Sequence, residues 1–224
     1  MFQRDQEVTT VEDAIIQGVL EVFTNYFDLL DTSMRDQLTG LLNRYSLEAN
    51  LDRLWNLLSS HTHADDRVDG ERVNPPELYW ICVLDVDHFK KINDGYGHII
   101  GDEVLIMVTR LLQDSFRQSD LLYRYGGEEF VAVVSANDLD AAIKIFERVR
   151  YKIEQFDFPQ VGRVTISGGF SCAEPSILPQ EVINRADCAL YAAKSAGCNR
   201  NLHYETLVSE GVLKEVATGS IDLF

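Results

Sequence analysis

The spacing of apolar residues along the chain changes repeatedly between the interval of helices and the pattern of strands. Helical spacing predicts helices over residues 9–34, 44–58, 87–93, 98–116, 138–155 and 179–196. Extended apolar runs predict strands over residues 78–86, 163–171 and 199–204, and a hairpin lies between residues 121 and 134. Because helices alternate with strands, we predict an α/β (α+β) domain in which helices cover the faces of a mixed sheet.

The hairpin reads LLYRYGGEEFVAVV, so that two apolar runs flank the pair Gly126-Gly127. Both glycines can take a positive φ without steric cost, which is typical of a tight hairpin turn. Glu128 and Glu129 follow the turn directly and are thereby held at a defined place. Taken alone, the segment is most simply a surface hairpin with two solvated acids.

Residues 78–87 read LYWICVLDVD, a nearly continuous apolar run that ends in Asp85 and Asp87. Such a run is typical of a central strand buried on both faces. Carboxylates at the end of such a strand lie where α/β sheets usually bind ligands. If the hairpin pairs beside this strand, Asp85 and Glu128 converge and repel each other unless a cation lies between them. Oxygen ligands of this kind suit Mg²⁺. Asp85 alone is also compatible with a helix-capping role.

The N-terminal helix carries an apolar face that is too wide to remain without a partner. One stripe is spaced alternately four and three residues apart, the interval of coiled coils. Its members are Ile16, Leu20, Phe23, Phe27, Leu30 and Met34. The helix could pack on its own domain or pair with a second copy. We predict self-association, because the helix precedes a complete-looking domain.

The composition narrows the classes of partner. The 224 residues carry a formal net charge of −16, which disfavours a nucleic-acid polymer as partner. A small phosphate-bearing substrate would need locally placed lysines and a divalent metal. The four cysteines have neither zinc-site nor redox-pair spacing, which favours reduced thiols and a cytoplasmic location. No apolar run is long enough for a membrane segment, and the N-terminus lacks a signal-peptide pattern.

Several motifs, in one order along the chain, resemble those of the GGDEF family, the diguanylate cyclases. They are DQLTGLLNR at 36–44, LDVDHFKKINDGYGHIIGD at 84–102, GGEEF at 126–130, TISGGFS at 165–171 and ADCALYAAKSAG at 186–197. The chain is thus identified as a member with the GGEEF variant of the signature. The resemblance implies a palm-like, mixed five-stranded antiparallel/parallel sheet, as in nucleotidyl cyclases. It also implies an N-terminal signalling and dimerisation helix at 1–35, a cyclase domain at 36–204 and a C-terminal tail at 205–224.

The family condenses two GTP molecules into cyclic di-GMP and two pyrophosphates, and it requires a homodimer. By motif position, Asp85 and Glu128 are the metal ligands, assisted by the Val86 carbonyl. Glu129 is expected at a second metal, so that each active site holds two Mg²⁺ or Mn²⁺ ions. Glu128 is also expected to help deprotonate the attacking hydroxyl. The alternative is a catalytically weak GGDEF domain that senses GTP or cyclic di-GMP.

The resemblance assigns Phe89, Lys90 and Lys194 to the phosphates of GTP, with Lys90 also placed in the catalytic set. Residues 89 and 90 begin a helix, where free main-chain N–H groups favour anions. The chain departs from the family at Cys198, where an arginine commonly adds a triphosphate contact. Arg200 lies two positions further on. Weaker GTP binding is therefore expected, without loss of catalysis.

The guanine base presents two neighbouring donors that one carboxylate can accept, and adenine does not. By motif position, Asp102 is the guanine-binding carboxylate, aided by Asn93, and His98 is assigned to substrate binding. A site built on such a buried polar partner rejects the wrong base strongly.

Residues 117–120 read RQSD, and an isolated RxxD is common and usually carries no function. At this distance before Gly126, however, Arg117 and Asp120 resemble the family's inhibitory product site. A guanidinium can bind phosphate or stack on guanine, and a carboxylate can accept from the guanine edge. Arg148 is expected to complete the site from a neighbouring domain. Feedback inhibition by cyclic di-GMP follows from this assignment.

Overall fold

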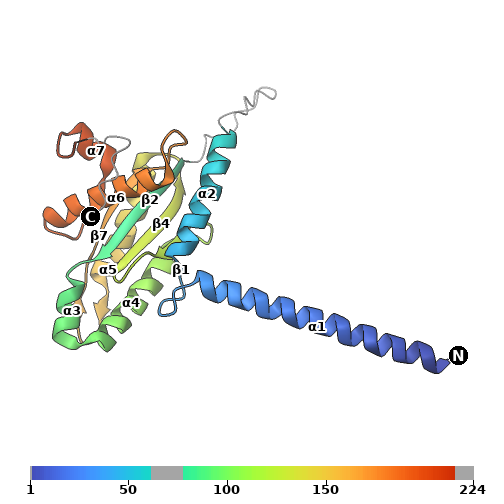
Figure 1. Cartoon of the computed structure of the whole chain (residues 1–224). Coiled ribbons are helices and arrows are strands. Elements are labelled where there is room, and N and C mark those ends of the chain that lie inside the picture. The colour runs from blue at the N-terminus through green and yellow to red at the C-terminus, as the bar shows by residue number, and fades with distance from the viewer. Residues whose placement is uncertain (1, 62–77, 215–224) are drawn as a thin grey trace.

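The computed structural model describes residues 2–61 and 78–214, and its centre is one six-stranded sheet (Figure 1). The strand order is β1-β3-β4-β2-β7-β8. The outer pairs β1–β3 and β7–β8 are parallel, and the inner pairs are antiparallel. The strands are β1 Leu42–Asn43, β2 Leu78–Val86, β3 Leu121–Arg124, β4 Glu129–Ala136, β7 Ile166–Cys172 and β8 Asn201–His203. A separate small hairpin joins β5 Asp157–Phe158 to β6 Gly162–Arg163.

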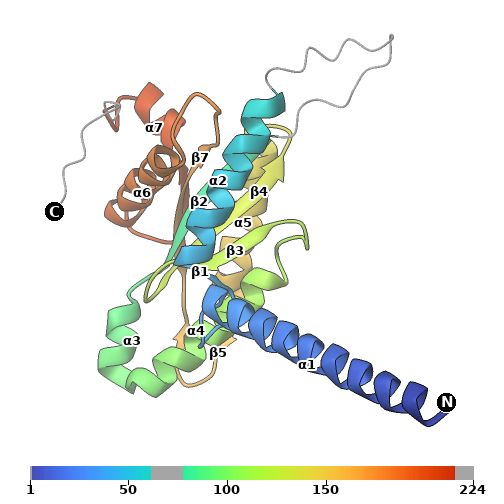
Figure 2. The ribbon, with the colours of Figure 1, turned by 45° about the vertical axis from the view of Figure 1, so that its right-hand side comes forward.

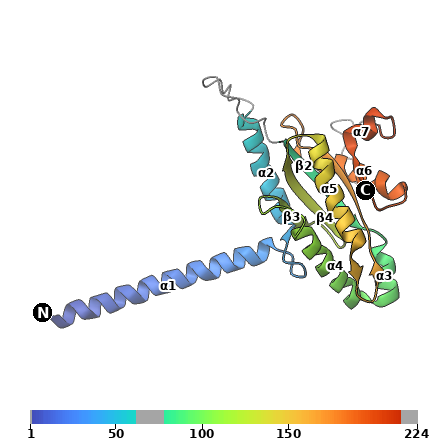
Figure 3. The same ribbon diagram turned by 180° about the vertical axis from the view of Figure 1, so that it is seen from behind.

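Helices cover both faces of the sheet, as the views from opposite sides show (Figures 1 and 3). The α2 and α6 helices lie on one face, and α4 and α5 lie on the other. Side chains of β2 alternate accordingly, because Ile81 and Val83 join one core cluster while Cys82 and Leu84 join the other. The helices are α1 Phe2–Met34, α2 Arg44–His61, α3 Phe89–Tyr96, α4 His98–Gln113, α5 Leu139–Gln155, α6 Pro179–Ser195 and α7 Tyr204–Ser209.

The predicted fold class is confirmed, and so are the limits of the central strand β2. The predicted number of five strands is one too low. The additional strand β1 is only two residues long and lies in the predicted break between the first two helices, where no period can be recognised. Two local predictions also hold. Asn43 caps α2 by accepting from the Ser46 N–H at 3.1 Å, and Gly197 follows α6 with a φ of 109°.

The reason given for the hairpin turn is wrong. Neither Gly126 nor Gly127 is among the glycines with positive φ. The connection between β3 and β4 is longer than a two-residue turn, and it closes through the Tyr125 N–H, which donates to the Glu129 carbonyl at 2.8 Å. A Cβ at Gly126 would lie 2.8 Å from a carboxylate oxygen of Glu129, the far end of a flexible side chain that could turn aside.

Gly169 allows α6 to lie directly on β7. A Cβ at this position would lie 2.0 Å from the Leu190 nitrogen and 2.1 Å from the Ala186 carbonyl oxygen. These are main-chain atoms of a packed helix and cannot turn aside. We therefore expect Gly169→Ala to lower the free energy of unfolding by about 3 kcal/mol, as overpacked cores do. Urea denaturation measures it, with Gly18→Ala as the control, because nothing lies within 4 Å of a Cβ there. Equal stability of the two variants would contradict this packing.

The α1 helix projects away from the domain in all three views (Figure 2). The interpretation that it packs on its own domain is therefore not supported by the described side chains. Pairing with a second copy stays a prediction. The large apolar side chains exposed on it are Ile15, Ile16, Val19, Leu20, Val22, Phe23, Tyr26 and Leu29.

The C-terminal part of the domain contains a helix that the sequence did not predict. The α7 helix buries Tyr204 and Leu207 in a small cluster with Ala189 of α6. Residues 215–224 of the predicted tail, and 62–77 of the predicted polar loop, lie outside the described residues, whereas 59–61 belong to α2. Within the described ranges, no helix is both long and apolar enough to cross a membrane.

Candidate functional site

The candidate metal ligands come from two adjacent strands, where β2 ends and β4 begins. Asp85 lies opposite Glu129 in the antiparallel register, so these two side chains share the α6 face of the sheet. The preceding Glu128 lies in the turn, and its carbonyl accepts from the Val86 N–H at 3.3 Å. The structure thus brings Asp85, Val86, Glu128 and Glu129 to one place, as the sequence predicted.

A pair of charges fixes the turn that carries Glu128. The Arg124 guanidinium donates to the Gly127 carbonyl at 2.7 and 3.2 Å. The same guanidinium binds the Asp36 carboxylate at 2.9 Å, with both side chains largely buried. Asp36 belongs to the segment that directly follows α1. The turn is therefore tied to the end of the N-terminal helix, a link that the sequence motifs alone did not reveal.

Lys194 reaches the same place from the last turn of α6. Its ammonium group donates to the Asp85 carboxylate, to the Asp85 carbonyl at 3.3 Å and to Asp87 at 2.8 Å. The sequence assigned Lys194 to substrate phosphates, and in this structure its partners are the two aspartates. The lysine therefore supplies positive charge at the centre of the acidic cluster.

Asp87 is the most enclosed acid of the site, with 4% of its surface exposed. Apart from Lys194, its carboxylate accepts from Thr165 at 2.6 Å, from Ser167 at 2.7 Å and from the Asn199 N–H at 2.9 Å. The sequence showed Asp87 at the end of the strand but gave it no role, because its partners come from segments distant in the sequence.

The surroundings shift the pKa values of the acids in this site in different directions. Burial would raise the pKa of Asp87, but hydrogen bonds from Lys194, Thr165 and Ser167 outweigh it and leave this pKa lowered. Burial raises the pKa of Asp85, and Lys194 offsets this only in part. Burial and the charge of Asp85 raise the pKa values of Glu128 and Glu129. Asp85, Glu128 and Glu129 thus carry negative charge that their surroundings do not fully neutralise.

Asp187 of α6 is a further acid of this cluster that the sequence analysis did not single out. Burial and the negative charge of Asp85 raise its pKa, and its own charge raises that of Glu129. The signal was present, because Asp187 precedes Lys194 by two helical turns and so lies on the same face of α6.

The residues at this position fit a divalent cation by chemistry. Asp85, Glu128 and Glu129 offer carboxylate oxygens, and Val86 offers a carbonyl, the donors that Mg²⁺ prefers. Burial is the main cause of their raised pKa values, and the charge of Asp85 adds to it at Glu128 and Glu129, so a bound cation would favour the ionised carboxylates. In the structure as described, no three acids, cysteines or histidines already lie close enough together to hold an ion. Binding would therefore require these side chains to draw together.

The predicted phosphate-binding residues Phe89 and Lys90 begin α3, directly after the acidic strand end. Phe89 is 5% exposed and anchors the helix in the core, while Lys90 is exposed. His88 before them has a left-handed φ of 58°, and no side chain caps the helix start. The first main-chain N–H groups of α3 thus have no side-chain acceptor at this end.

The predicted guanine-binding residues lie where α3 and α4 meet. Asn93 packs against Gly101, since a Cβ at Gly101 would lie 2.0 Å from the Asn93 Oδ1 atom. Asp102 follows Gly101 and is exposed, as is His98 at the start of α4. Because Gly101 has no side chain, the Asn93 amide can lie directly against it, one residue before Asp102.

The predicted inhibitory residues lie together at the far end of α4. The Arg117 N–H donates to the Asp120 carboxylate at 2.8 Å, so the RxxD segment closes on itself. Arg148 of α5 donates to the Ser115 carbonyl at 2.6 Å, two residues before Arg117. Within one chain, Arg148 therefore reaches the residues just before the RxxD segment, and its contribution to the site of a neighbouring domain stays a prediction.

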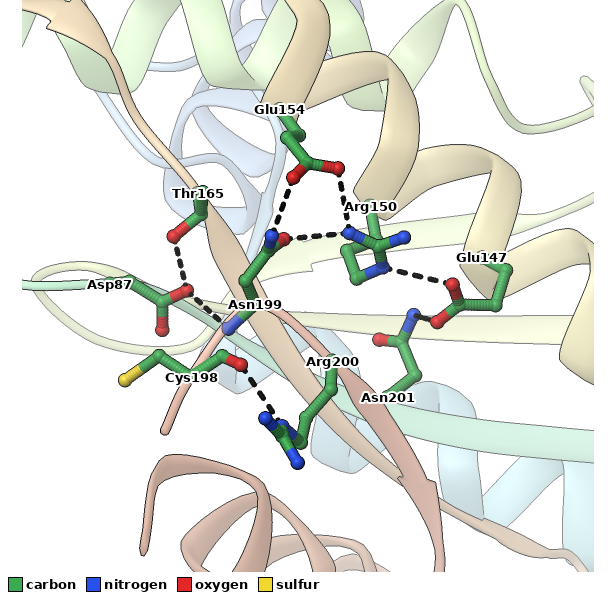
Figure 4. Close-up of polar contacts among 9 residues, drawn as sticks. All are labelled: Asp87, Glu147, Arg150, Glu154, Thr165, Cys198, Asn199, Arg200 and Asn201. Atoms are coloured by element: carbon green, nitrogen blue, oxygen red, sulfur yellow. Dashed lines mark hydrogen bonds and ion pairs between the residues drawn. The ribbon is translucent and has the colours of Figure 1, made fainter. Parts of the chain in front are cut away.

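The loop after α6 carries the residue that departs from the family motif. Cys198 and Asn199 have left-handed φ values of 63° and 50°. Arg200 donates to the Cys198 carbonyl at 3.0 Å, so its guanidinium is engaged by the loop itself (Figure 4). Asn199 binds two side chains of α5 (Figure 4).

Known proteins with similar sequences point to the same family that the sequence motifs resemble. Residues 33–200 match the family described as "Diguanylate cyclase, GGDEF domain". The chain is 36% identical over 208 residues to diguanylate cyclase DgcP of Pseudomonas aeruginosa, covering 88% of this chain and 29% of the relative. It is 40% identical over 205 residues to the probable diguanylate cyclase DgcT of Escherichia coli, covering 89% and 42%. The chain thus spans less than half the length of these relatives.

Among solved structures, the coiled coil and GGDEF domain of DgcB from Caulobacter crescentus, in complex with c-di-GMP, is similar with a TM-score of 0.74 and 25% identity. The match covers 87% of this chain and 97% of that one. The active GGEEF domain of a Vibrio cholerae diguanylate cyclase is similar with a TM-score of 0.61 and 28% identity, covering 73% and 97%. With the family match extending from residue 33 to residue 200, the chain belongs to the GGDEF-domain family of diguanylate cyclases.

Proposed function

We propose that this chain is a diguanylate cyclase of the GGEEF type, which condenses two GTP molecules into cyclic di-GMP and two pyrophosphates. The observation that carries the proposal is the meeting of Asp85 with the Glu128–Glu129 turn at adjacent strand ends. Burial raises the pKa values of all three carboxyl groups, and the charge of Asp85 raises those of Glu128 and Glu129 further, which supports a cation at this place. In a GGDEF-family chain, this is the place where a divalent cation and the triphosphate of GTP would bind.

In each half of the reaction, the 3′-hydroxyl of one GTP forms a bond to the α-phosphorus of the other. The bond from that phosphorus to the bridging oxygen breaks, and pyrophosphate leaves. A bound Mg²⁺ or Mn²⁺ pair would supply charge neutralisation and lower the hydroxyl's pKa. Asp85, the Val86 carbonyl and Glu128 would hold the first ion, and Glu129 would contact the second. Glu128 is also the group proposed to accept the proton of the attacking hydroxyl.

The remaining residues bind and orient GTP in this proposal. Lys90 and Lys194 neutralise the triphosphate, and the Phe89 main chain offers an N–H at the start of α3. Asp102, with Asn93 beside it, accepts from the guanine edge, and His98 contacts the same substrate. Lys194 would exchange part of its present contact with Asp85 for phosphate oxygens once a cation binds the carboxylate.

The test of the function is direct. The full chain is incubated with GTP and Mg²⁺, and nucleotides are separated by chromatography. The proposal expects cyclic di-GMP and pyrophosphate in a ratio of one to two, from GTP but not from ATP. Intact GTP after prolonged incubation at high protein concentration would refute it.

A second candidate is a domain that binds GTP or cyclic di-GMP without turnover. One observation favours it: Cys198 replaces a commonly basic residue, and Arg200 binds the Cys198 carbonyl. The same chromatography distinguishes the two, because a sensor would bind GTP in calorimetry and leave it unchanged.

We also propose product inhibition through Arg117, Asp120 and Arg148. Support comes from their placement, since Arg148 binds the carbonyl of Ser115 next to the RxxD segment. The double variant Arg117→Ala with Asp120→Ala is expected to bind cyclic di-GMP at least about tenfold more weakly, because charge-assisted hydrogen bonds are lost. Calorimetry measures the affinity of the protein for cyclic di-GMP.

The control is Lys144→Ala on α5. Lys144 is an exposed cation, and its loss should change the binding of cyclic di-GMP less than twofold. Unchanged product binding in the double variant would contradict the assignment.

A further inference from the structure

The loop that follows α6 has a backbone that needs support from side chains. Gly197, Cys198 and Asn199 all have positive φ values, of 109°, 63° and 50°. Only glycine adopts this region freely, and asparagine is among the few other residues that tolerate it. Two of these three residues carry side chains in a conformation that costs free energy. The loop will therefore hold this shape only if other contacts stabilise it.

Asn199 supplies those contacts with every polar group of its side chain. Its Oδ1 accepts from Arg150 Nη1 at 2.8 Å, and its Nδ2 donates to Glu154 Oε1 at 2.8 Å. Arg150 and Glu154 are themselves paired at 2.9 Å on α5, so the amide meets a fixed donor and a fixed acceptor (Figure 4). Only an amide can satisfy both, because a carboxylate there would repel Glu154.

The main chain of Asn199 faces the opposite way, toward the acidic cluster. Its N–H donates to Asp87 Oδ2 at 2.9 Å, while the other oxygen of Asp87 accepts from Lys194 at 2.8 Å. Asp87 thus links the loop to the lysine. Lys194 is the basic residue in the last turn of α6, and cysteine stands at position 198. With cysteine at 198, the proposed cations for the triphosphate are Lys90 and Lys194, so the position of the Lys194 ammonium group matters more than it would in a site that also has an arginine.

We propose that Asn199 is a positioning residue, whose amide anchors the loop to Arg150 and Glu154 so that Asp87 holds Lys194 where the triphosphate binds. This inference rests on the proposed function, because it takes Lys194 as a ligand of GTP. Asn199 itself contacts no substrate in this account. Its effect reaches the nucleotide through Asp87 and Lys194.

The test measures the affinity of a non-hydrolysable GTP analogue with Mg²⁺ in calorimetry, in the full chain. Asn199→Ala is expected to weaken binding about tenfold, as coupled neighbours in one network do. In a Lys194→Ala background, the same substitution should change binding less than twofold, because the group that it positions is gone. An effect that does not act through Lys194 would lower affinity equally in both backgrounds, and that result would overturn the proposal.

Asn201→Ala is the matched control. Its amide also donates to α5, to Glu147 at 2.8 Å, but no contact ties it to Asp87. We expect it to lower the thermal midpoint about as much as Asn199→Ala and to leave analogue affinity within twofold of wild type.

If Asn199→Ala does not fold, Asn199→Asp replaces it. The expected result is the same: weaker binding of the analogue when Lys194 is present, and little change in the Lys194→Ala background. Wild-type affinity in the folded variant would overturn the proposal. Absence of cyclic di-GMP from the wild-type protein would instead refute the proposed function.

Discussion

Replacement of Glu128 by glutamine is expected to lower the rate of cyclic di-GMP formation by at least about a hundredfold. The side chain keeps its size, but it loses the charge that would bind the cation and the group that would accept the hydroxyl proton. The turn should remain in place, because Arg124 holds it through the Gly127 carbonyl rather than through Glu128. Initial rates at saturating GTP and Mg²⁺ measure the effect.

The control for this substitution is Glu174→Gln, an exposed glutamate in the segment between β7 and α6. It removes the same charge elsewhere and should leave the rate within twofold of wild type. Thermal midpoints of both variants should lie close to that of wild type. A Glu128→Gln protein that retains more than half of the wild-type rate would show that this carboxylate takes no part in the chemistry.

Removal of residues 1–30 is expected to lower the rate at least tenfold in dilute protein and much less in concentrated protein. In the proposed reaction two domains meet face to face, each with one GTP, and pairing of the helices would raise their effective concentration. The cut keeps Ser33 and Met34, whose carbonyls accept hydrogen bonds from Asn43 and Ser46 of the domain. Rates measured over a dilution series test this expectation.

Point variants in α1 distinguish the loss of helix pairing from the loss of the helix itself. Leu20 and Ile16 are 58% and 56% exposed, so charges there should disrupt association without disturbing the domain. Ile16→Glu with Leu20→Glu should reproduce the dilution effect, whereas Gln17→Glu, on the same exposed helix, should not. A rate independent of concentration in the truncated protein would contradict the role assigned to α1.

The strands and helices with a clear apolar period could be predicted from sequence. The nine-residue strand β2 was recognised because both of its faces are buried and it reads as one apolar run. The two-residue β1 could not be recognised, since its pairing with β3 depends on how the chain folds after α1. The glycine pair predicts the place of the turn before Glu129 correctly, but neither glycine has a positive φ, because the longer connection closes through the Tyr125 N–H and the Glu129 carbonyl.

The site was predictable where its residues lie within motifs and not where distant segments meet. The apolar run before Asp85 and the hairpin before Glu128 predict two adjacent strands whose acids converge. The structure pairs these strands, β2 and β4. The contacts of Asp87 join residues up to 112 positions apart, and nothing in the sequence around it indicates them. The contact of Lys194 with two aspartates was likewise hidden, because a lysine on a helix is most often solvated.

The central claim is that acids from β2 and β4 bind one divalent ion beside GTP. Anomalous diffraction from crystals grown with Mn²⁺ and a non-hydrolysable GTP analogue tests it most directly. We expect a manganese peak about 2 Å from carboxylate oxygens of both Asp85 and Glu128, with the triphosphate completing its ligands. A nucleotide-bound ion that lies away from either carboxylate would contradict the account.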